Sequence, residues 1–294
     1  MIKHLFILFG LWFIISCASP AEQNDEYDSS TSKLPDLNLV NGVEIVTWNI
    51  EFFPKAGQRT IDSVAMIIRN INADIYCLQE ITNETVFNQL DEKLDNYSSI
   101  YSTATEYLNL AILYKNDVMT FRNQSSILTD YSYEFASRPP LRAEFIFTAD
   151  TSIEFTLINI HLKCCDDGFT RRKASAELLH DYISESMTNG VINQIVVGDW
   201  NDDISDNSSV NSFNMFLSDT DNFKFMTWDL ANSTSNVYDS YPSYSSFIDH
   251  ILVSQDLFDE AETGDVQTIR LGDYISGYDE IISDHRPVVW RFTP

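Results

Sequence analysis

Polar side chains that could act on a phosphate ester stand directly after apolar runs of the chain. A carboxylate, an amide or an imidazole follows several short runs of β-forming residues, and these side chains are Asn49, Glu80, His161, Asp199 and Asn201. Because strand ends at one edge of a sheet lie close together, groups at these positions can meet at a single rim. The pattern therefore indicates one site that is assembled from distant parts of the chain.

The chemistry that these residues offer most directly is the binding of a hard cation. A phosphodiester resists attack because its negative charge repels nucleophiles, and a divalent cation neutralises that charge and orients the ester oxygens. Mg²⁺ prefers oxygen ligands and keeps several waters, so one or two carboxylates and an amide are enough. Glu80 and Asn49 supply such a set, and Asp284 is a candidate for a further ligand. We expect a Mg²⁺ site, which Mn²⁺ or Ca²⁺ could also occupy.

The apolar runs predict the strands and helices that would carry these groups. Expected strands cover residues 43–48, 73–78, 108–114, 141–148, 153–160, 192–197, 247–253 and 287–292. Apolar residues at helical spacing predict helices over residues 60–71, 85–94 and 170–187. Strands alternate with helices early in the chain and follow strands later, which favours two packed sheets with helices outside.

The polar positions fall within short motifs whose order is itself informative. The motifs are TWNIE (47–51), CLQE (77–80), NIHLK (159–163), GDWND (198–202), FIDHILVS (247–254) and ISDHRPV (282–288). Their order and spacing, over nearly all of residues 43–294, resemble the endonuclease/exonuclease/phosphatase superfamily, which includes exonuclease III-like nucleases, deoxyribonucleases, inositol polyphosphate phosphatases and neutral sphingomyelinases. The resemblance implies an α+β fold, a four-layer αββα sandwich of two packed, mostly antiparallel mixed sheets with outer helices.

The resemblance also implies roles for the residues of the expected site. Glu80 would be the firmest metal ligand, and Asp199 would position and deprotonate the attacking water. A carboxylate close to a metal stays ionised and can accept a proton. Asn201, which follows in the same motif, would contact the phosphate and donate hydrogen bonds where charge develops.

Histidines complete the set that the resemblance implies. His285 would face the phosphoryl group with Asp249 as its partner, and a paired carboxylate favours the cationic imidazolium. His161 would be a second imidazole that touches the phosphate. His250 follows Asp249 directly, so it would point to the opposite side of a strand.

Two arginines are candidates for binding the substrate phosphate. Arg142 lies in a segment rich in arginine and proline that also contains Arg138, and Arg171 opens the helix expected after residue 169. A guanidinium can bind phosphate with two parallel hydrogen bonds. The alternative for Arg142 is an ordinary surface ion pair, which contributes little to stability, and the alternative for Arg171 is a solvated helix face.

The first forty residues differ in composition from the rest. Residues 5–15 form an apolar run that is long enough for a signal peptide and short for a membrane span. The run ends at Ile14-Ile15-Ser16-Cys17, which resembles the lipobox of bacterial lipoproteins, so residues 1–17 are expected to be a signal peptide with Cys17 lipidated after cleavage. A plain secretory signal is the alternative. Residues 18–40 are expected to be a flexible tether, and residues 41–294 a single catalytic domain.

Charge and cysteine content bound the choice of substrate. The net charge is −26, from 44 acidic and 18 basic residues, which argues against a broad basic surface for nucleic acid but not against a nuclease with a local phosphate site. The segment Cys164–Gly168 is not part of the family pattern and could shape the mouth of the site. The disulfide pairing of Cys77, Cys164 and Cys165 stays open.

The sequence thus predicts an exported, lipid-anchored, monomeric Mg²⁺-dependent phosphodiesterase at a bacterial membrane surface, with extracellular DNA or RNA as the first expected substrate. A phosphoesterase that acts on phospholipids or on small molecules such as inositol phosphates is the alternative among enzymes. A surface binding lipoprotein without catalysis is the alternative from another class.

Overall fold

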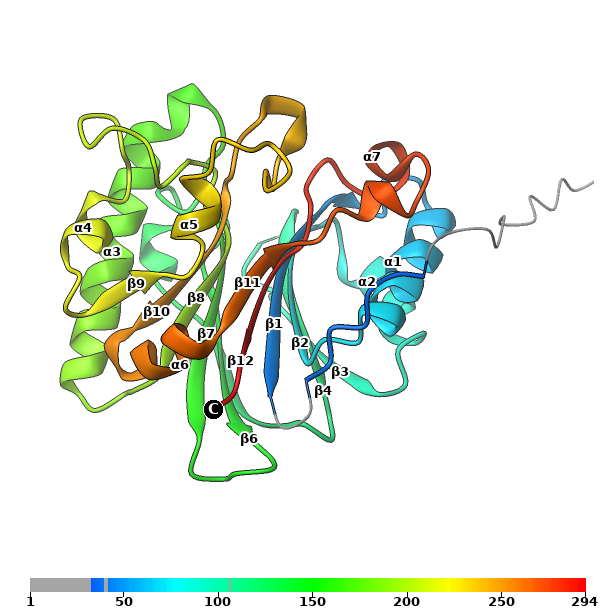
Figure 1. Cartoon of the computed structure of the whole chain (residues 1–294), viewed down its shortest axis with the longest axis horizontal. Coiled ribbons are helices and arrows are strands. Elements are labelled where there is room, and N and C mark those ends of the chain that lie inside the picture. The colour runs from blue at the N-terminus through cyan, green and yellow to red at the C-terminus, as the bar shows by residue number, and fades with distance from the viewer. Residues whose placement is uncertain (1–32, 40–41, 106) are drawn as a thin grey trace, which may run out of the picture. The chain divides into compact units, whose positions relative to one another are not determined.

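The computed structural model describes residues 33–39, 42–105 and 107–294 (Figure 1). The expected signal peptide, the lipidation site at Cys17 and most of the expected tether lie outside these residues. Of the helices in the described ranges, none combines the length and the apolar character needed to cross a bilayer.

Two six-stranded sheets form the centre of the domain (Figure 1). The first has the order β11-β12-β1-β2-β4-β3, with strands Asp265–Thr268, Val288–Phe292, Val43–Phe53, Ile75–Ile81, Asn109–Lys115 and Tyr97–Tyr101. The second has the order β5-β6-β7-β8-β10-β9, with strands Met119–Ser126, Leu141–Phe147, Glu154–His161, Gln194–Asp199, Asp249–Ser254 and Phe223–Phe225. Within each sheet one pair is parallel, β1 with β2 and β7 with β8, and the other pairs are antiparallel.

Helices cover the outer faces of both sheets, which confirms the predicted four layers. Helices α1 (Gln58–Ile71) and α2 (Glu84–Asp91) lie outside the first sheet, and α3 (Phe169–Thr188) and α4 (Asn214–Ser218) outside the second (Figure 1). The short helices α5 (Trp228–Ala231), α6 (Phe258–Thr263) and α7 (Tyr278–Ile281) lie in the later connections. The predicted helices thus exist within a few residues of their expected bounds.

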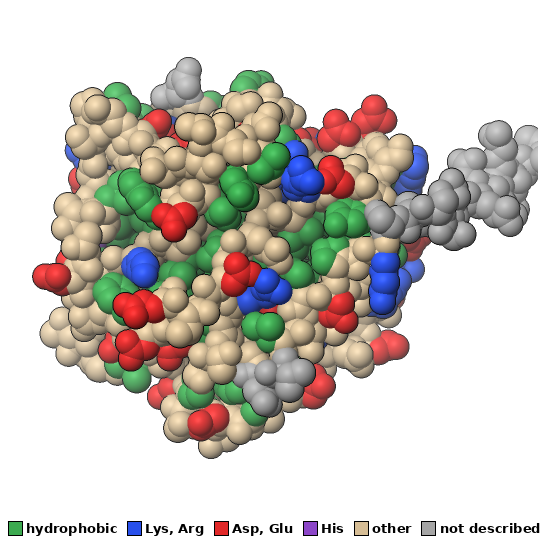
Figure 2. Space-filling view, in the orientation of Figure 1, with side chains coloured by type: hydrophobic (Ala, Val, Ile, Leu, Met, Phe, Trp, Pro, Cys, Tyr) green, Lys and Arg blue, Asp and Glu red, His purple; other side chains and the backbone are tan. Residues whose placement is uncertain are grey.

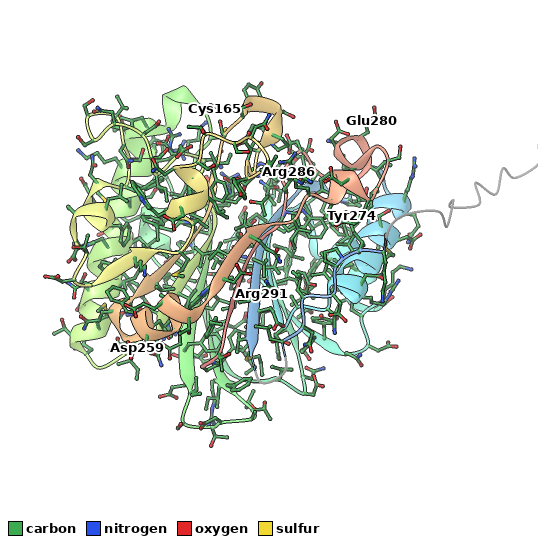
Figure 3. All side chains as sticks on the ribbon, in the orientation of Figure 1. Cys165, Asp259, Tyr274, Glu280, Arg286 and Arg291 are labelled. Atoms are coloured by element: carbon green, nitrogen blue, oxygen red, sulfur yellow. The ribbon has the colours of Figure 1, made fainter. Side chains whose placement is uncertain are left out.

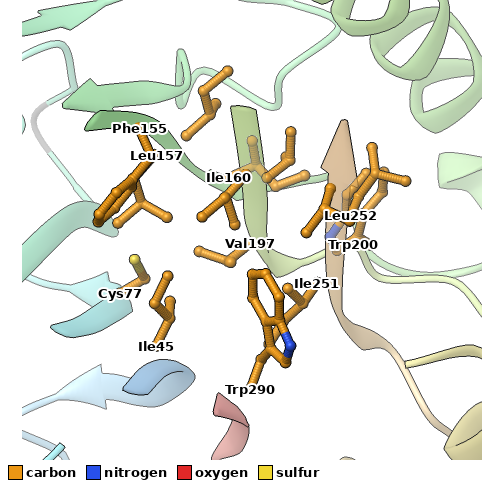
Figure 4. Packing of buried hydrophobic residues seen from close by; sticks show 14 of the residues in the cluster. Ile45, Cys77, Phe155, Leu157, Ile160, Val197, Trp200, Ile251, Leu252 and Trp290 are labelled. Carbon is orange, nitrogen blue, oxygen red and sulfur yellow. The ribbon is translucent and has the colours of Figure 1, made fainter. Parts of the chain in front are cut away.

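Alternation along the strands separates two apolar cores. On β1, Ile45 belongs to the core between the two sheets, while Val46 and Trp48 belong to the core beneath α1 and α2. Figure 4 shows the inter-sheet core, in which Cys77 and Trp290 from the first sheet pack near side chains of the second. Successive side chains of a strand point to opposite faces, so a strand covered on both sides reads as a continuous apolar run.

The strands that the apolar pattern did not predict are edge or near-edge strands. β5 is largely polar, and β9 and β11 have only three and four residues. β3 has the sequence YSSIY, in which only the first and fourth residues are buried. Such strands carry little apolar signal because one edge or one face meets water.

The beginning of the domain also differs from its expected boundary. Leu34 and Leu37, which were expected to belong to the tether, are buried in the core beneath α1 and α2. The Leu37 amide donates to the Ile71 carbonyl at 2.9 Å. The chain therefore packs on the domain before residue 41, because these two leucines bury apolar surface that the polar segment before them lacks.

Gly198 lets the two parallel strands of the second sheet approach closely. It has φ +152°, and a Cβ there would lie 2.0 Å from the Ile160 carbonyl oxygen on β7. We expect Gly198→Ala to destabilise the fold by about 3 kcal/mol, because the backbone itself must move. Urea unfolding measures this, with Gly190→Ala as the control: Gly190 has φ +86° and nothing within 4 Å. The Gly190→Ala control measures only the cost of placing a Cβ on left-handed backbone, about 1–2 kcal/mol. Equal losses in both variants would contradict the prediction.

Candidate active site

The predicted polar residues gather at one edge of the sandwich, where β1, β2, β7 and β8 end. In the second sheet, His161, Asp199 and Asp249 occupy paired positions on three neighbouring strands, since His161 pairs with Asp199 and Asp199 with Asp249. Figure 3 labels Cys165, which follows the motif of His161, and Arg286, which follows His285, in the upper half of the view. Strand register thus places three ionisable groups side by side.

The Asn49 side chain joins the two sheets at this edge. Its Nδ2 donates to Glu80 Oε1 at 3.2 Å and to Asp199 Oδ2 at 3.0 Å. Its Oδ1 accepts the Glu51 amide at 3.0 Å, which fixes the orientation of the side-chain amide. Asn49 is almost completely buried, so its hydrogen bonds hold the two carboxylates at a fixed separation without competition from water.

The chain reaches these positions through unusual backbone conformations. Glu80 lies at φ +65° and Asn201 at φ +57°, and Glu51 and Phe52 also have positive φ. The β1–β2 pairing is irregular between Asn49 and Phe53, and the Phe52 amide donates to Glu80 Oε2 at 3.0 Å. Left-handed backbone is costly for residues with a Cβ and concentrates at functional sites.

His161 lies against both carboxylates as a neutral imidazole. Its Nε2 is 3.4 Å from Asp199 Oδ2 and 3.7 Å from Glu80 Oε1. Burial, together with the charges of Arg138 and His285, lowers the pKa of His161 well below its ordinary value. A neutral ring offers one N–H donor and one acceptor, so His161 can hydrogen-bond a carboxylate or a substrate oxygen without adding charge.

His285 is the charged imidazole of the site. Its Nδ1 is 2.8 Å from Asp249 Oδ2, and its Nε2 lies 3.9 Å from Asp199 Oδ2. Burial alone would lower the pKa of His285, but the carboxylates of Asp249 and Asp199 outweigh it and raise the pKa to about 10. The ring is therefore an imidazolium at neutral pH, and its Nε2 also lies 4.0 Å from Asp284 Oδ1.

The loop that carries His285 is tied to β1 by buried hydrogen bonds. Ser283 Oγ donates to the Asn49 carbonyl at 2.7 Å and accepts the His285 amide at 3.0 Å. Tyr278 OH donates to the His285 carbonyl at 2.6 Å and accepts from Trp48 Nε1 at 2.9 Å. The imidazolium and the Asn49 bridge therefore share one rigid support.

Asn201 and Asp284 flank the carboxylates. The Asn201 amide donates to Asp199 Oδ1 at 2.9 Å, and its side-chain Nδ2 donates to the Leu162 carbonyl at 3.2 Å. The Asp284 amide donates to Glu51 Oε2 at 2.9 Å. Burial raises the pKa of Asp284, and its buried Oδ1 has no hydrogen-bond partner among the described residues.

These residues fit a divalent cation. Burial raises the pKa of Asp199 to about 7, and the negative charges of Asp249 and Glu80 act in the same direction. The unpartnered Asp284 oxygen and the Glu80 carboxylate supply the oxygen ligands that Mg²⁺ prefers. Asp199, Asp249 and His285 also offer ligand atoms within 4.8 Å of one another. His285 and Asp249 already share a hydrogen bond, so this group is also suited to handling a proton. Asn49, expected as a ligand, turns its amide nitrogen and not its oxygen to the carboxylates.

The arginines predicted to bind phosphate have partners outside this group. Arg142 on β6 pairs with Glu144, and Arg171 donates to the Tyr133 carbonyl and stacks over the Tyr133 ring at 4.3 Å. Arg138 lies closer to the centre: its guanidinium donates to the carbonyls of His161 and Leu162 at 3.2 and 2.8 Å. Of the two arginines in this segment, Arg138 is the one that contacts the end of β7.

The Cys164–Cys165 segment lies beside this centre. The two sulfurs are 2.7 Å apart as free thiols, and Cys77 is buried separately in β2. Arg172 donates to the Cys165 carbonyl at 2.8 Å and pairs with Asp202 at 3.0 Å. The segment is thereby fastened to the loop that follows Asp199.

A cavity of about 940 Å³ lies away from this centre. Its walls come from β9, β11 and the helices next to them, and include Phe216, Phe225, Trp228 and Phe258.

The arrangement of sheets and strand-end residues is matched by known proteins. The model of the Endonuclease/Exonuclease/phosphatase family matches residues 46–285. The chain belongs to this family. Enzymes of the family are phosphoesterases, nucleases among them, that use divalent metals, and this chain has their fold. Comparison with curated proteins finds no match.

Solved structures share the fold at low sequence identity. TDP2 from Caenorhabditis elegans has 19% identity and a TM-score of 0.65, over 85% of this chain and 74% of that chain. D. rerio TDP2 complexed with single strand DNA product has 14% identity and a TM-score of 0.67, over 87% and 100%. A Bacteroides vulgatus protein of the same family has 18% identity and a TM-score of 0.60, over 86% and 98%.

The high pKa of His285 can be tested directly. In metal-free protein, NMR of the five histidines should show an imidazolium that persists to about pH 10. Asp249→Asn should lower that pKa by about 1–3 units because it removes the opposite charge. Since the folded pKa lies above 6.5, this pair stabilises the fold fully below pH 6.5 and loses that contribution as pH rises through about 10. His285→Gln assigns the signal, and an ordinary pKa for it in the unmodified protein would contradict the geometry.

Proposed function

We propose that the protein is a divalent-metal-dependent phosphodiesterase that hydrolyses nucleic acid by in-line attack of water. The observation that carries the proposal is the position of Asp199. It lies between the Asn49 amide at 3.0 Å, the neutral His161 ring at 3.4 Å and the His285 imidazolium at 3.9 Å. A proton acceptor, a neutral hydrogen-bonding ring and a cationic donor thus converge on one small space.

The residues divide the reaction among them. A bound Mg²⁺ on Glu80 and Asp284 would neutralise the phosphate charge and orient its oxygens. Asp199 accepts a proton from the water that attacks phosphorus, and the P–O bond to the leaving oxygen breaks. The leaving oxygen takes a proton from His285 Nε2 or from solvent, which gives a phosphate monoester and an alcohol. His285, held by Asp249, donates from Nε2 to the charge that develops on the phosphoryl oxygens or on the leaving oxygen.

Two further residues fix the phosphate at the rim. Asn201 is anchored beside Asp199 by the Leu162 carbonyl, and we assign its amide to a non-bridging phosphate oxygen. His161 contacts the same group as a neutral ring. Arg138 binds the carbonyls at the end of β7, which carries His161, and its positive charge acts on the carboxylates of Asp199 and Glu80. The site thus binds one phosphate without a broad basic surface.

Nucleic acid is the substrate class that this proposal favours. A related structure is that of D. rerio TDP2 with a single strand DNA product, which supports the choice at the level of the fold. Export and lipid anchoring through Cys17, and a monomeric state, remain part of the proposal on the sequence pattern alone. Hydrolysis of sphingomyelin or of inositol phosphates in place of DNA and RNA, in one assay with and without chelator, would contradict the proposed substrate. If the unmodified protein turned over none of these substrates with metal present, the proposal that it is an enzyme would be contradicted.

Asp199→Asn should lower kcat by about a thousandfold or more, because the amide cannot take the proton from water. Circular dichroism and thermal unfolding should show an intact fold, since the side chains have nearly the same shape. The control is Asp221→Asn, which changes an exposed aspartate away from the centre and should keep full activity. Turnover of Asp199→Asn near that of the unmodified protein would refute its assignment as the proton acceptor.

Glu80→Gln should raise the Mg²⁺ concentration for half-maximal activity by about tenfold or more, because a charged oxygen ligand is lost. Calorimetric titration of Mg²⁺ should show the same weakening without substrate. Glu84→Gln, at an exposed position of the same connection, is the matched control. An unchanged metal titration in Glu80→Gln would count against metal binding by this residue.

A further inference from the structure

A stack of aromatic rings leads outward from the catalytic histidine. The Tyr241 ring lies 4.7 Å from the His285 ring at an interplanar angle of 35°. The Tyr244 ring lies 5.2 Å from that of Tyr241 at 8°, which is a nearly parallel stack. His285 is buried, Tyr241 is half-buried and Tyr244 is 75% exposed, so the rings run from the reacting centre to solvent.

The position of this stack relative to the centre is fixed by the backbone. Tyr241 and Ser246 exchange backbone hydrogen bonds of 3.0 and 3.2 Å, which close the turn that carries both tyrosines. The preceding residue, Ser240, accepts the Asp249 amide at 3.1 Å on its Oγ and the Arg286 amide at 2.7 Å on its carbonyl. The turn is therefore bound to the partner of His285 and to the residue after it.

Packing against His285 explains the position of the Tyr241 ring, but packing does not explain the exposed position of the Tyr244 ring. The Tyr241 ring covers His285, and burial together with nearby Asp284 raises the pKa of its hydroxyl, so it stays neutral. Tyr244 presents one face to Tyr241 and leaves most of its surface in water. An exposed ring held parallel to another ring next to a phosphate site has the form of a stacking platform.

A second exposed aromatic pair lies on the metal side of the centre. The Phe52 amide donates to Glu80 Oε2, and the Phe52 and Tyr107 rings lie 6.4 Å apart. These two side chains are 48% and 54% exposed. Exposed aromatic side chains therefore lie near the carboxylates and near the imidazolium, in two separate parts of the chain.

The net negative charge of the chain makes a stacking platform useful for binding nucleic acid. With a net charge of −26, the protein repels a polyanion at long range, and Figure 2 shows basic side chains scattered singly over the face in view. Base stacking needs no charge, and it is tolerant of sequence because every base has a π-face. It can therefore supply affinity that phosphate contacts do not.

We infer that Tyr241 and Tyr244 form a subsite for an unpaired nucleobase next to the scissile phosphate. The inference rests on the proposed function and narrows it: the substrate is a strand with unstacked bases, not a lipid headgroup or an inositol phosphate. A base in a duplex is already paired and stacked, so it must first leave the helix to reach Tyr244. Single strands are therefore preferred over duplexes of the same sequence.

The test compares two substrates and a series of side chains. On a single-stranded DNA oligonucleotide, Tyr244→Ala should raise KM by about tenfold to a hundredfold, with kcat nearly unchanged. Tyr244→Phe should match the unmodified protein, and Tyr244→Leu should resemble Tyr244→Ala. On an abasic strand of the same length, the unmodified protein and Tyr244→Ala should have equal KM, because the base that stacks is missing.

Matched controls separate this inference from the proposed function. Trp228→Ala removes an aromatic side chain that is 41% exposed at the distant cavity, and it should leave KM unchanged on both substrates. An unchanged KM for Tyr244→Ala on the oligonucleotide, or an equal loss on the abasic strand, overturns the subsite while hydrolysis of DNA stands. If the unmodified protein hydrolyses neither DNA nor RNA, the proposed function and the subsite fall together.

Discussion

The buried amide of Asn49 is the interaction on which the site depends. It comes from the first sheet, contacts Glu80 on the neighbouring strand, and reaches across to Asp199 in the second sheet. Because its oxygen is occupied by the Glu51 amide, the amide can face the two carboxylates in only one way. The separation of the two sheets therefore determines the separation of the expected metal ligand and the expected proton acceptor.

In this geometry the negative charge of the carboxylates is only partly offset by positive charge on the described residues. His285 carries a positive charge because two carboxylates face it, whereas His161 is neutral because burial and two neighbouring cations oppose its protonation. Two similar rings a short distance apart thus hold different charges, and so they can serve different parts of one reaction. The remaining negative charge on Glu80 and Asp284 is what a divalent cation would neutralise.

The sequence predicted the central strands well because both their faces are covered. β7 and β8 end within about two residues of their expected ends, so the sequence alone could place His161 and Asp199 together. His250 points away from the centre to Thr227, as strand alternation predicted. Polar edge strands such as β5 lacked that signal. Tyr244 stands in a turn rich in serine and tyrosine, where no periodicity shows which face its side chain joins.

Left-handed backbone at Glu80 and Asn201 has a consequence for how this protein could be changed. A glycine would relieve the conformational cost at Glu80 but would also remove the proposed metal ligand, whereas an asparagine, as at position 201, tolerates this conformation better than most residues. Resistance to heat and turnover thus favour different residues at particular backbone positions, and not across the whole molecule. Gains in robustness that preserve activity must come from the helices and the cores, far from these bends.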